Sequence, residues 1–213
     1  MSNATKIPVL PSVRAMREWR QQQMERPIGL VITMGALHGT LRRSLTFTLE
    51  SAHIMRSKMG TSTLVRICTS GYIVEIHMRV VLVRRSLADN VTTVLSLFVN
   101  PAQFAPNEDY GTYPKTFDHD MKQLADALAE SSVQANAVVF LPSVKDMYPS
   151  GIELNVSDQK GAFVEVKGFS HQMEGNTRPT FFRGVATVST CHTISIVGNN
   201  SHIFSRWWQS SST

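Results

Sequence analysis

The chain has 213 residues, of which 42% are hydrophobic and 17% charged, a size that fits one domain with room for a small second one. This hydrophobic content excludes a disordered chain, 12 Gly and 9 Pro are too few for a fibrous protein, and two Cys cannot form a disulfide scaffold. No apolar run reaches the roughly 20 residues that span a bilayer, and residues 1–11 lack the apolar stretch of a secretory signal. We therefore expect a cytoplasmic protein with no membrane partner.

The net charge of +5 is concentrated in one segment. Residues 41–90 carry eight Lys and Arg against three Asp and Glu, so this segment alone accounts for the whole excess. A protein that binds a polyanion is expected to display a basic face, and here no recognition helix and no interleaved aromatic side chain beyond Tyr72 accompanies the arginines. We expect no nucleic-acid partner, and a nucleic-acid-binding module built on this segment is the least favoured of three hypotheses.

The first predicted helix lies between Pro11 and Pro27, because apolar side chains recur there at helical spacing. Residues 28–33 then form a short apolar run without polar alternation, which is typical of a buried parallel strand. Met34 and Gly35 follow directly, which indicates a tight loop at the end of this strand.

Two more strands are predicted at residues 91–99 and 137–141, since both runs are apolar and are closed by a nearby proline. Between them, Thr116 is predicted to cap a helix whose first turn carries Asp118 and Asp120. The order strand, helix, strand indicates an α/β fold with a parallel sheet, whose functional loops follow the carboxyl ends of the strands.

Two stretches do not match this plan. Residues 40–81 lack a sustained helical period, the alternation at 74–80 predicts a half-exposed strand, and a helix is expected only from Leu82. Residues 189–213 are polar and Ser-rich, so we expect this tail to be poorly ordered.

Five short motifs follow one another along the chain. They are residues 33–39 (TMGALHG), 98–104 (FVNPAQF), 107–114 (NEDYGTYP), 147–149 (MYP) and 174–188 (EGNTRPTFFRGVATV). This ordered set resembles the pantothenate synthetase family, whose members are also called pantoate–β-alanine ligases. The resemblance covers residues 8–39 and 82–188.

The resemblance implies a Rossmann-like fold of the HIGH-type nucleotidylyl transferases, a parallel sheet with flanking helices over residues 1–188. It implies binding of ATP and Mg²⁺, attack of the pantoate carboxylate on the α-phosphorus to give pantoyl adenylate and pyrophosphate, and displacement of AMP by the amine of β-alanine. Such a reaction relies mainly on positioning and on stabilising phosphate charge. The resemblance also implies a homodimer.

The family pattern assigns roles to seven residues. It makes His38 the first histidine of the nucleotide motif and a catalytic donor to phosphate oxygens, with Gly35 and Gly39 beside ATP. It assigns pantoate binding to the remaining four residues, which are Met34, Asn100, Gln103 and Tyr113. No metal ligand is assigned, because the other six histidines lack metal-ligand spacing.

Several of these residues have ordinary structural alternatives. His38 could be a surface or core histidine, Met34 a core residue, and Asn100 a turn residue before proline. Gln103 is more informative, because a neutral amide between Ala102 and Phe104 needs a partner if it is buried. Further along the chain, either phosphate or Glu174 could pair with two arginines, Arg178 and Arg183.

The chain departs from the family pattern at two points. Thr40 and Leu41 follow Gly39 where the family has a second histidine, so residues 40–81 are predicted to be an insertion that splits the phosphate-binding turn. Residues 189–213 are predicted to be non-homologous, and the family's C-terminal domain is expected to be missing. Translated intron sequence is our hypothesis for both stretches. We expect impaired ligase activity, or alternatively a non-catalytic remnant that binds pantoate or nucleotide weakly.

Overall fold

The computed structural model describes residues 7–23, 28–34, 55–56, 63–67, 75–104, 110–113, 115–131, 135–153, 156–168, 173–176, 178 and 180–197. They divide into two units. The first unit holds the β-sheet with two helices, and the second holds the remaining helices and the loops between them.

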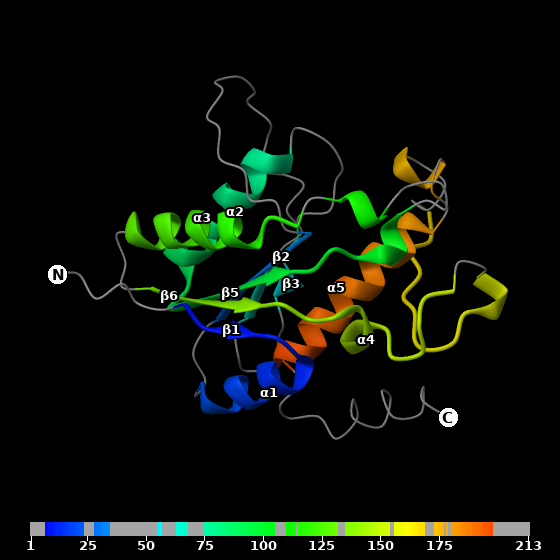
Figure 1. Ribbon diagram of the computed structural model, residues 1–213, viewed down its shortest axis with the longest axis horizontal. Helices are drawn as coiled ribbons and strands as arrows, with labels where there is room; N and C mark the ends of the chain where they lie inside the picture. Colours follow the sequence, from blue (N-terminus) through cyan, green and yellow to red (C-terminus); the bar gives the residue numbers. More distant parts are fainter. Residues whose placement is uncertain are drawn as a thin grey trace. The chain divides into compact units, whose positions relative to one another are not determined.

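The first unit is built on a six-stranded sheet (Figure 1). Its strands, in spatial order, are β1 (Val9–Leu10), β6 (Asn136–Phe140), β5 (Thr92–Leu97), β2 (Ile28–Thr33), β4 (Thr63–Ile67) and β3 (Met55–Arg56). All neighbours pair in parallel except β3, which is antiparallel to β4. The predicted α/β fold and its three predicted strands are therefore confirmed.

Helices α2 (Glu75–Asp89) and α3 (Phe117–Ala129) cover one face of this sheet (Figure 1). The core lies between the sheet and these two helices, where apolar side chains at alternate strand positions meet the apolar stripes of the helices. Its members include Val31, Leu95 and Val139 from the strands, and Leu87 and Leu124 from the helices. All six residues of β2 and all six of β5 are buried, which explains why both strands read as continuous apolar runs.

The predicted strand at 74–80 is wrong, because α2 begins at Glu75, seven residues before the expected helix start. Ile76, Val80, Val83 and Leu87 are spaced four, three and four residues apart, so the apparent alternation belongs to a longer helical period. Within residues 40–81, the described parts therefore comprise β3, β4 and the first turns of α2, and β4 pairs with β2 in register.

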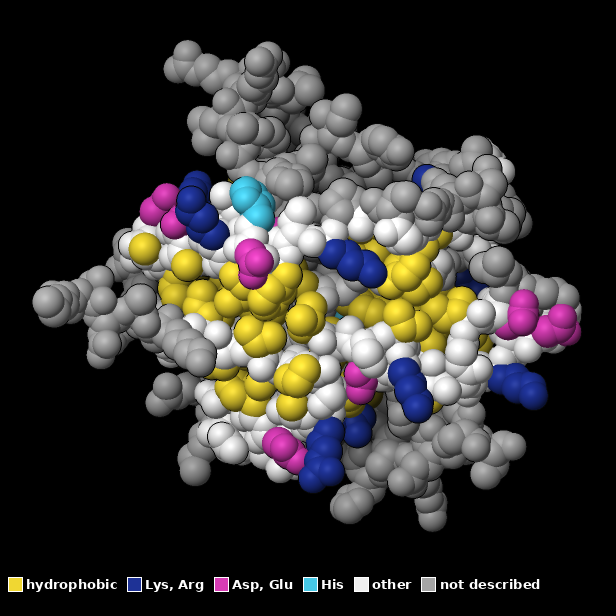
Figure 2. Space-filling view, in the orientation of Figure 1, with side chains coloured by type: hydrophobic (Ala, Val, Ile, Leu, Met, Phe, Trp, Pro, Cys, Tyr) yellow, Lys and Arg dark blue, Asp and Glu magenta, His cyan; other side chains and the backbone are white. Residues whose placement is uncertain are grey.

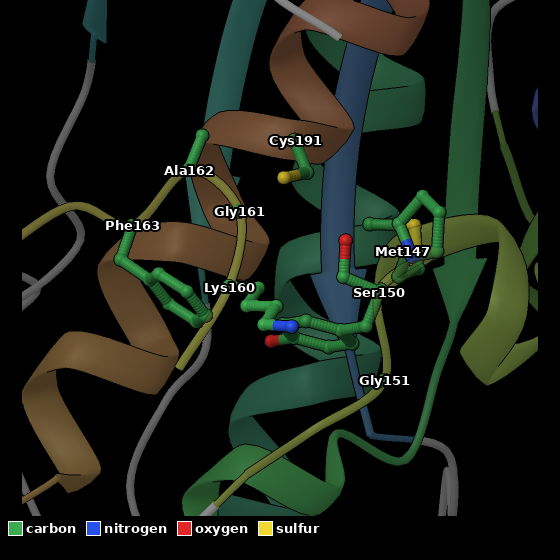
Figure 3. Close-up of a pocket in the computed structure, with 10 residues that line it drawn as sticks. Met147, Ser150, Gly151, Lys160, Gly161, Ala162, Phe163 and Cys191 are labelled. Carbon is green, nitrogen blue, oxygen red and sulfur yellow. The ribbon is translucent and has the colours of Figure 1, made fainter. Parts of the chain in front are cut away.

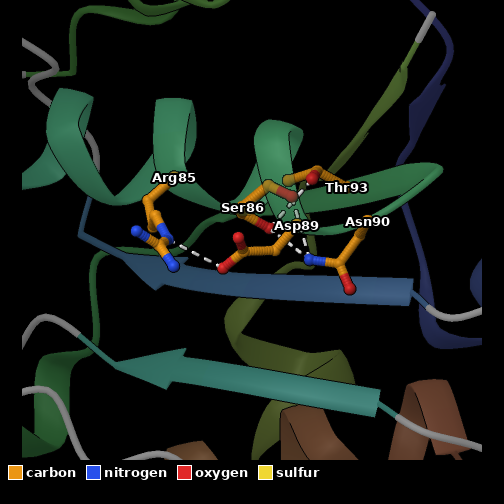
Figure 4. A network of polar contacts seen from close by, with 5 residues as sticks. All are labelled: Arg85, Ser86, Asp89, Asn90 and Thr93. Atoms are coloured by element: carbon orange, nitrogen blue, oxygen red, sulfur yellow. Dashed lines mark hydrogen bonds and ion pairs between the residues drawn. The ribbon is translucent and has the colours of Figure 1, made fainter. Parts of the chain in front are cut away.

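A buried polar network fixes the C-terminal end of α2 to the sheet (Figure 4). The hydroxyls of Ser86 and Thr93 lie 2.8 Å apart, and Asn90 Nδ2 donates to Ser86 O at 2.9 Å. Gly29 of β2 faces this network, since a Cβ there would lie 2.0 Å from Ser86 Oγ. Only glycine leaves space for this close approach of helix and strand.

The N-terminus of α3 differs from the prediction in one detail. Thr116 occupies the cap position, but its hydroxyl makes no cap hydrogen bond to the backbone. It donates instead to Asp120 Oδ1 at 3.3 Å. The predicted boundary is confirmed, and the predicted capping contact is wrong: Thr116 has φ −105° and ψ 45° and not the extended backbone of a capping residue, so its hydroxyl oxygen accepts from none of the first N–H groups.

The second unit contains α1 (Val13–Gln22), α4 (Val144–Met147) and α5 (Phe181–Val197), together with short 3₁₀ turns. The turns are η2 (Pro101–Gln103), η3 (Tyr110–Thr112), η4 (Val156–Asp158) and η5 (Met173–Asn176). The first predicted helix is confirmed as α1, which packs against α5. Among the described residues, no helix is long and apolar enough to cross a bilayer.

Part of the predicted disordered tail is helical, because α5 continues to Val197. Its polar residues bond to the carbonyl one turn back: the side chains of Thr190, His192, Thr193 and Ser195 contact the backbone oxygens of Ala186, Val188, Ser189 and Cys191. These local bonds remove most of the cost of burying polar groups. The expectation of disorder is therefore wrong for residues 189–197, and residues 198–213 lie outside the described part.

Candidate functional site

The loops that follow β2 and β5 start side by side. Thr33, the last residue of β2, pairs with Leu97, the last residue of β5, and Phe98 N donates to Thr33 O at 3.0 Å. Met34 follows β2 directly and is half-buried. In an open parallel sheet, ligands bind outside such adjacent carboxyl ends. The three predicted ATP residues, which are Gly35, His38 and Gly39, lie outside the described residues.

Asn100 organises the loop after β5. Its Oδ1 accepts a hydrogen bond from Ala102 N at 3.2 Å and so caps the turn η2, while its Nδ2 donates to Gly184 O at 3.2 Å. The side chain is fully buried. The ordinary turn function that sequence reasoning left open for Asn100 is thus present in the structure.

Gln103 ends the same turn and is 5% exposed. Its backbone N–H donates to Asn100 O at 3.2 Å, but its side-chain Oε1 is buried and has no hydrogen-bond partner among the described residues. A buried acceptor without a partner costs about 1–3 kcal/mol. Such an atom points to a ligand that donates a hydrogen bond to it.

Tyr148 is the third member of this buried group. Its hydroxyl donates to Asn100 Oδ1 at 2.8 Å, and the residue is 6% exposed. Burial raises the pKa of Tyr148 well above its ordinary value, with the nearby Cys191 adding to the rise and the hydrogen bond with Asn100 opposing it. The phenol therefore stays neutral and keeps its proton for donation.

Gly184 of α5 lies against the opposite side of the turn. A Cβ at this position would lie 2.7 Å from Ala102 O and 3.2 Å from Gln103 Cγ. The helix thus approaches the loop backbone more closely than any residue with a side chain allows. Gly184 supplies both this space and the carbonyl that Asn100 contacts.

Tyr113 packs near this loop through Phe104, the residue after Gln103. The rings of Phe104 and Tyr113 meet edge to face with centroids 5.7 Å apart, and Tyr110 meets Phe104 in the same manner at 5.5 Å. The structure therefore brings together Asn100, Gln103 and Tyr113 of the predicted pantoate residues, all within the second unit.

The two arginines in the last motif have contacts that sequence reasoning did not anticipate. Arg183 Nη1 lies 3.0 Å from Glu165 Oε1, and its guanidinium lies 4.6 Å from the ring centroid of Phe163. The guanidinium of Arg178 lies 5.8 Å from the ring centroid of Phe181. Aromatic stacking of this type suits the planar guanidinium.

Two cavities border Tyr148 in the second unit. Figure 3 shows the larger, of about 30 Å³, with Ser150, Lys160 and Cys191 on its wall; the smaller is about 10 Å³. These volumes suit one or two water molecules, so neither cavity holds a nucleotide. Burial raises the pKa of Cys191 to about 11, which keeps its thiol protonated at neutral pH and unreactive as a nucleophile.

Tyr148 and Gly184 are the site residues that sequence reasoning missed. Both lie in motifs that carry the family resemblance, at 147–149 and 174–188, but no role was predicted for either. The only available signal was their membership of these motifs, since their contacts join segments 48 and 84 residues apart.

Comparison with known proteins identifies the family. The family model for pantoate-β-alanine ligase matches residues 43–206. The chain belongs to the pantoate–β-alanine ligase family. It is 36% identical over 187 residues to the pantoate–β-alanine ligase of Saccharomyces cerevisiae, covering 85% of this chain and 46% of the yeast protein. It is 43% identical over 122 residues to the pantothenate synthetase of Acetivibrio thermocellus, covering 57% of this chain and 37% of that protein.

Solved structures of this family support the fold. The crystal structure of pantothenate synthetase from Thermus thermophilus matches 90% of this chain and 49% of that chain, with a TM-score of 0.58 at 26% identity. The Rossmann-like fold inferred for the family is therefore confirmed. The chain spans about half the length of the curated relatives it matches.

Proposed function

We propose that this chain acts in the ATP-dependent condensation of pantoate with β-alanine to pantothenate, through pantoyl adenylate and with release of AMP and pyrophosphate. Membership of the pantoate–β-alanine ligase family supports this proposal. A crystal structure of the pantoate–β-alanine ligase from Francisella tularensis is a complex with beta-gamma ATP and β-alanine. The single structural observation that carries the proposal is the buried, unpartnered Oε1 of Gln103 in the turn that follows β5.

Gln103 would bind pantoate through both ends of its carboxamide. Its Oε1 would accept a hydrogen bond from a pantoate hydroxyl, and its Nε2 would donate to a carboxylate oxygen. Tyr113 would line this pocket, and Asn100 would hold the loop in place. The role of Met34 in pantoate binding is proposed from the family pattern alone. Fixing the carboxylate in this manner leaves its second oxygen free to attack phosphorus.

His38 is proposed as the donor to the phosphate oxygens of ATP, in a turn where Gly35 and Gly39 permit close approach of the backbone. Mg²⁺ would enter with ATP, since it is usually bound by substrate phosphates and water rather than by an all-protein cage. The amine of β-alanine would then attack the acyl carbon of the adenylate, and AMP would leave.

The substitution Gln103→Met tests the proposed pantoate site. Methionine keeps the length of the side chain and removes both polar groups, so we expect pantoate affinity in calorimetry to fall about tenfold or more, because hydrogen bonds to charged groups contribute about 1.5–3 kcal/mol. The free energy of unfolding should stay equal or rise, because the unpartnered oxygen is removed.

Gln159→Met is the matched control. Gln159 also has a buried Oε1 without a hydrogen-bond partner among the described residues, and it lies in the same unit. Its Nε2, however, donates to Glu153 O at 2.6 Å, so this carboxamide is held without a ligand. The substitution Gln159→Met should leave pantoate affinity unchanged. Equal pantoate affinity of wild type and Gln103→Met would contradict the proposed site.

The second candidate is a non-catalytic protein that binds pantoate or nucleotide weakly. The observation that favours it is the interrupted nucleotide motif, with Thr40 and Leu41 in place of the family's second histidine. Incubation with ATP, magnesium, pantoate and β-alanine separates the two candidates. Release of AMP that depends on pantoate supports the ligase, whereas pantoate binding without AMP supports the second candidate.

We propose that residues 40–81 are an insertion, and that residues 189–213 are unrelated to the family, with translated intron as the source of both. The family-model match runs across residues 43–81 and 189–206, which argues against the proposal for those parts. Sequencing the mature transcript tests this. A message that joins the codons of Gly39 and Leu82 supports the proposal, and a message that encodes residues 40–81 overturns it.

We also propose a cytoplasmic homodimer. Light scattering of the purified chain should give twice the mass of 23.7 kDa. A monomer at micromolar concentration would contradict the dimer. Fractionation of the source cells tests the compartment.

A further inference from the structure

We propose that Tyr148 is a positioning residue for Gln103: it fixes Asn100, and Asn100 fixes the turn that carries Gln103. This inference rests on the proposed role of Gln103 in pantoate binding. It gives a task in the reaction to a tyrosine that lies 45 positions further along the chain and reaches Gln103 through Asn100.

The first step is the orientation of the Asn100 carboxamide. Tyr148 donates to Oδ1 at 2.8 Å, Ala102 N donates to the same oxygen at 3.2 Å, and Nδ2 donates to Gly184 O at 3.2 Å. A flipped amide would direct Nδ2 at the Ala102 N–H and Oδ1 at the Gly184 carbonyl. Both pairings are repulsive, so the contacts with Ala102 and Gly184 select a single orientation. The Tyr148 hydroxyl, which could donate or accept, holds the selected amide with a third hydrogen bond.

The second step is the dependence of Gln103 on its backbone. Within the described part of the chain, Gln103 Oε1 has no hydrogen bond that could hold the side chain in place. Its position is therefore set by η2, whose Ala102 and Gln103 N–H groups both bond to Asn100. The close contact with Gly184 limits the turn from the other side.

The third step is the effect of losing the hydroxyl. Without it, Asn100 Oδ1 keeps one donor in a fully buried place, so the amide keeps its orientation but is held less tightly. The turn then samples more conformations, and Gln103 moves with it. A misplaced carboxamide loses its paired contacts to a rigid hydroxy acid.

Tyr148→Phe removes only this hydroxyl, and Thr190→Val is its control. Thr190 Oγ1 donates to Ala186 O at 2.8 Å within α5, so this substitution deletes one hydroxyl bond of similar length in the same unit without touching the bonds that hold η2. Amide hydrogen exchange of the free chain is the first measurement. We expect the Ala102 N–H to exchange about tenfold faster in Tyr148→Phe and at the wild-type rate in Thr190→Val.

A double-mutant cycle in pantoate binding is the second measurement. Tyr148→Phe should weaken pantoate binding about tenfold in the wild-type background and leave it unchanged in Gln103→Met, because the tyrosine acts only through this glutamine. A merely structural role would give equal losses in both backgrounds. Equal losses, or no loss in either background, would overturn the inference.

The two measurements separate this inference from the proposed function. If the wild-type chain binds no pantoate, the proposed function fails for this chain, and hydrogen exchange at Ala102 still decides the positioning of the turn. If pantoate binds and exchange at Ala102 is unchanged in Tyr148→Phe, the positioning inference fails alone. Should Tyr148→Phe not fold, Tyr148→3-fluorotyrosine replaces it: this stronger hydroxyl donor should slow exchange at Ala102, and an unchanged rate overturns the inference.

Discussion

His192 makes the stability of α5 depend on pH. It is fully buried, and burial lowers its pKa to about 4, with the Val188 carbonyl contact at its Nδ1 opposing this shift. In the unfolded chain the imidazole has an ordinary pKa of about 6.5. Between these two values only the unfolded state binds the proton, so stability is lost as the pH falls.

We expect the free energy of unfolding to fall by about 3 kcal/mol between pH 6.5 and pH 4 because of this histidine. Urea unfolding at several pH values measures the loss. His192→Asn, which keeps a polar side chain but does not titrate, should lower stability at pH 7 and flatten this part of the profile. Equal slopes for the two proteins would show that His192 accepts its proton while the chain is folded.

Gly184→Ala tests the close contact between α5 and η2. Helix propensity alone would make alanine more stable by about 1 kcal/mol. The new Cβ would lie 2.7 Å from Ala102 O, a backbone atom, so we expect a net destabilisation of about 1–3 kcal/mol in urea unfolding. A gain in stability would show that the turn moves aside at little cost.

At the scale of single residues, the environment of Gln103 can be predicted from the sequence better than that of its neighbours. An amide between two apolar residues at a strand end already indicates a buried polar group in need of a partner, and the unpartnered Oε1 agrees. The role of Tyr148 could not be predicted, because it depends on a contact across 48 positions. The pantoate and ATP roles assigned to all seven residues remain predictions.

At the scale of elements, the contact between α2 and β2 can be tested through Gly29. A Cβ at Gly29 would lie 2.0 Å from Ser86 Oγ and 2.6 Å from Asn90 Nδ2. Both side chains belong to the polar network drawn in Figure 4. We expect Gly29→Ala to lower the free energy of unfolding by about 2–3 kcal/mol. Ser86→Ala alone should cost about 1 kcal/mol for the lost hydroxyl pair with Thr93.

The double variant Gly29→Ala/Ser86→Ala should lose less free energy of unfolding than the two single variants lose together, because removal of Ser86 Oγ makes space for the new methyl group. Chemical unfolding of all four proteins gives this coupling energy. Additive losses would mean that the clash is relieved by movement of the helix and not by the serine.

Strands were easier to predict than helix boundaries. The strands β2, β5 and β6 are apolar runs between turn residues, so composition alone indicates them. The start of α2 was missed because a few alternating residues fit both the two-residue period of a strand and the longer period of a helix. Only the wider window from Ile76 to Leu87 decides between the two periods.

At the scale of the whole molecule, the positive charge is partly neutralised by the fold. In the basic segment, Arg84 Nη2 lies 2.6 Å from Glu130 Oε2, and Arg85 Nε lies 2.9 Å from Asp89 Oδ2. On the face in Figure 2, Lys and Arg side chains of the described residues lie apart, with Asp and Glu among them. On this face, the described residues give no continuous track for a phosphate backbone.

We therefore expect no binding to a 20-base-pair DNA duplex at physiological salt, measured by fluorescence anisotropy at chain concentrations up to about 10 μM. The test decides the hypothesis of a nucleic-acid-binding module. A salt-sensitive rise in anisotropy in the low micromolar range would revive it.

The second half of α5 shows how a helix can tolerate an unusual sequence. Four polar side chains in this half of the helix each form a hydrogen bond with the backbone carbonyl four residues earlier. They belong to Thr190, His192, Thr193 and Ser195. These four contacts lie within α5 and do not depend on the elements that pack against it. A helix can therefore carry several hydroxyl-bearing residues in succession without a polar partner for each of them on a neighbouring element.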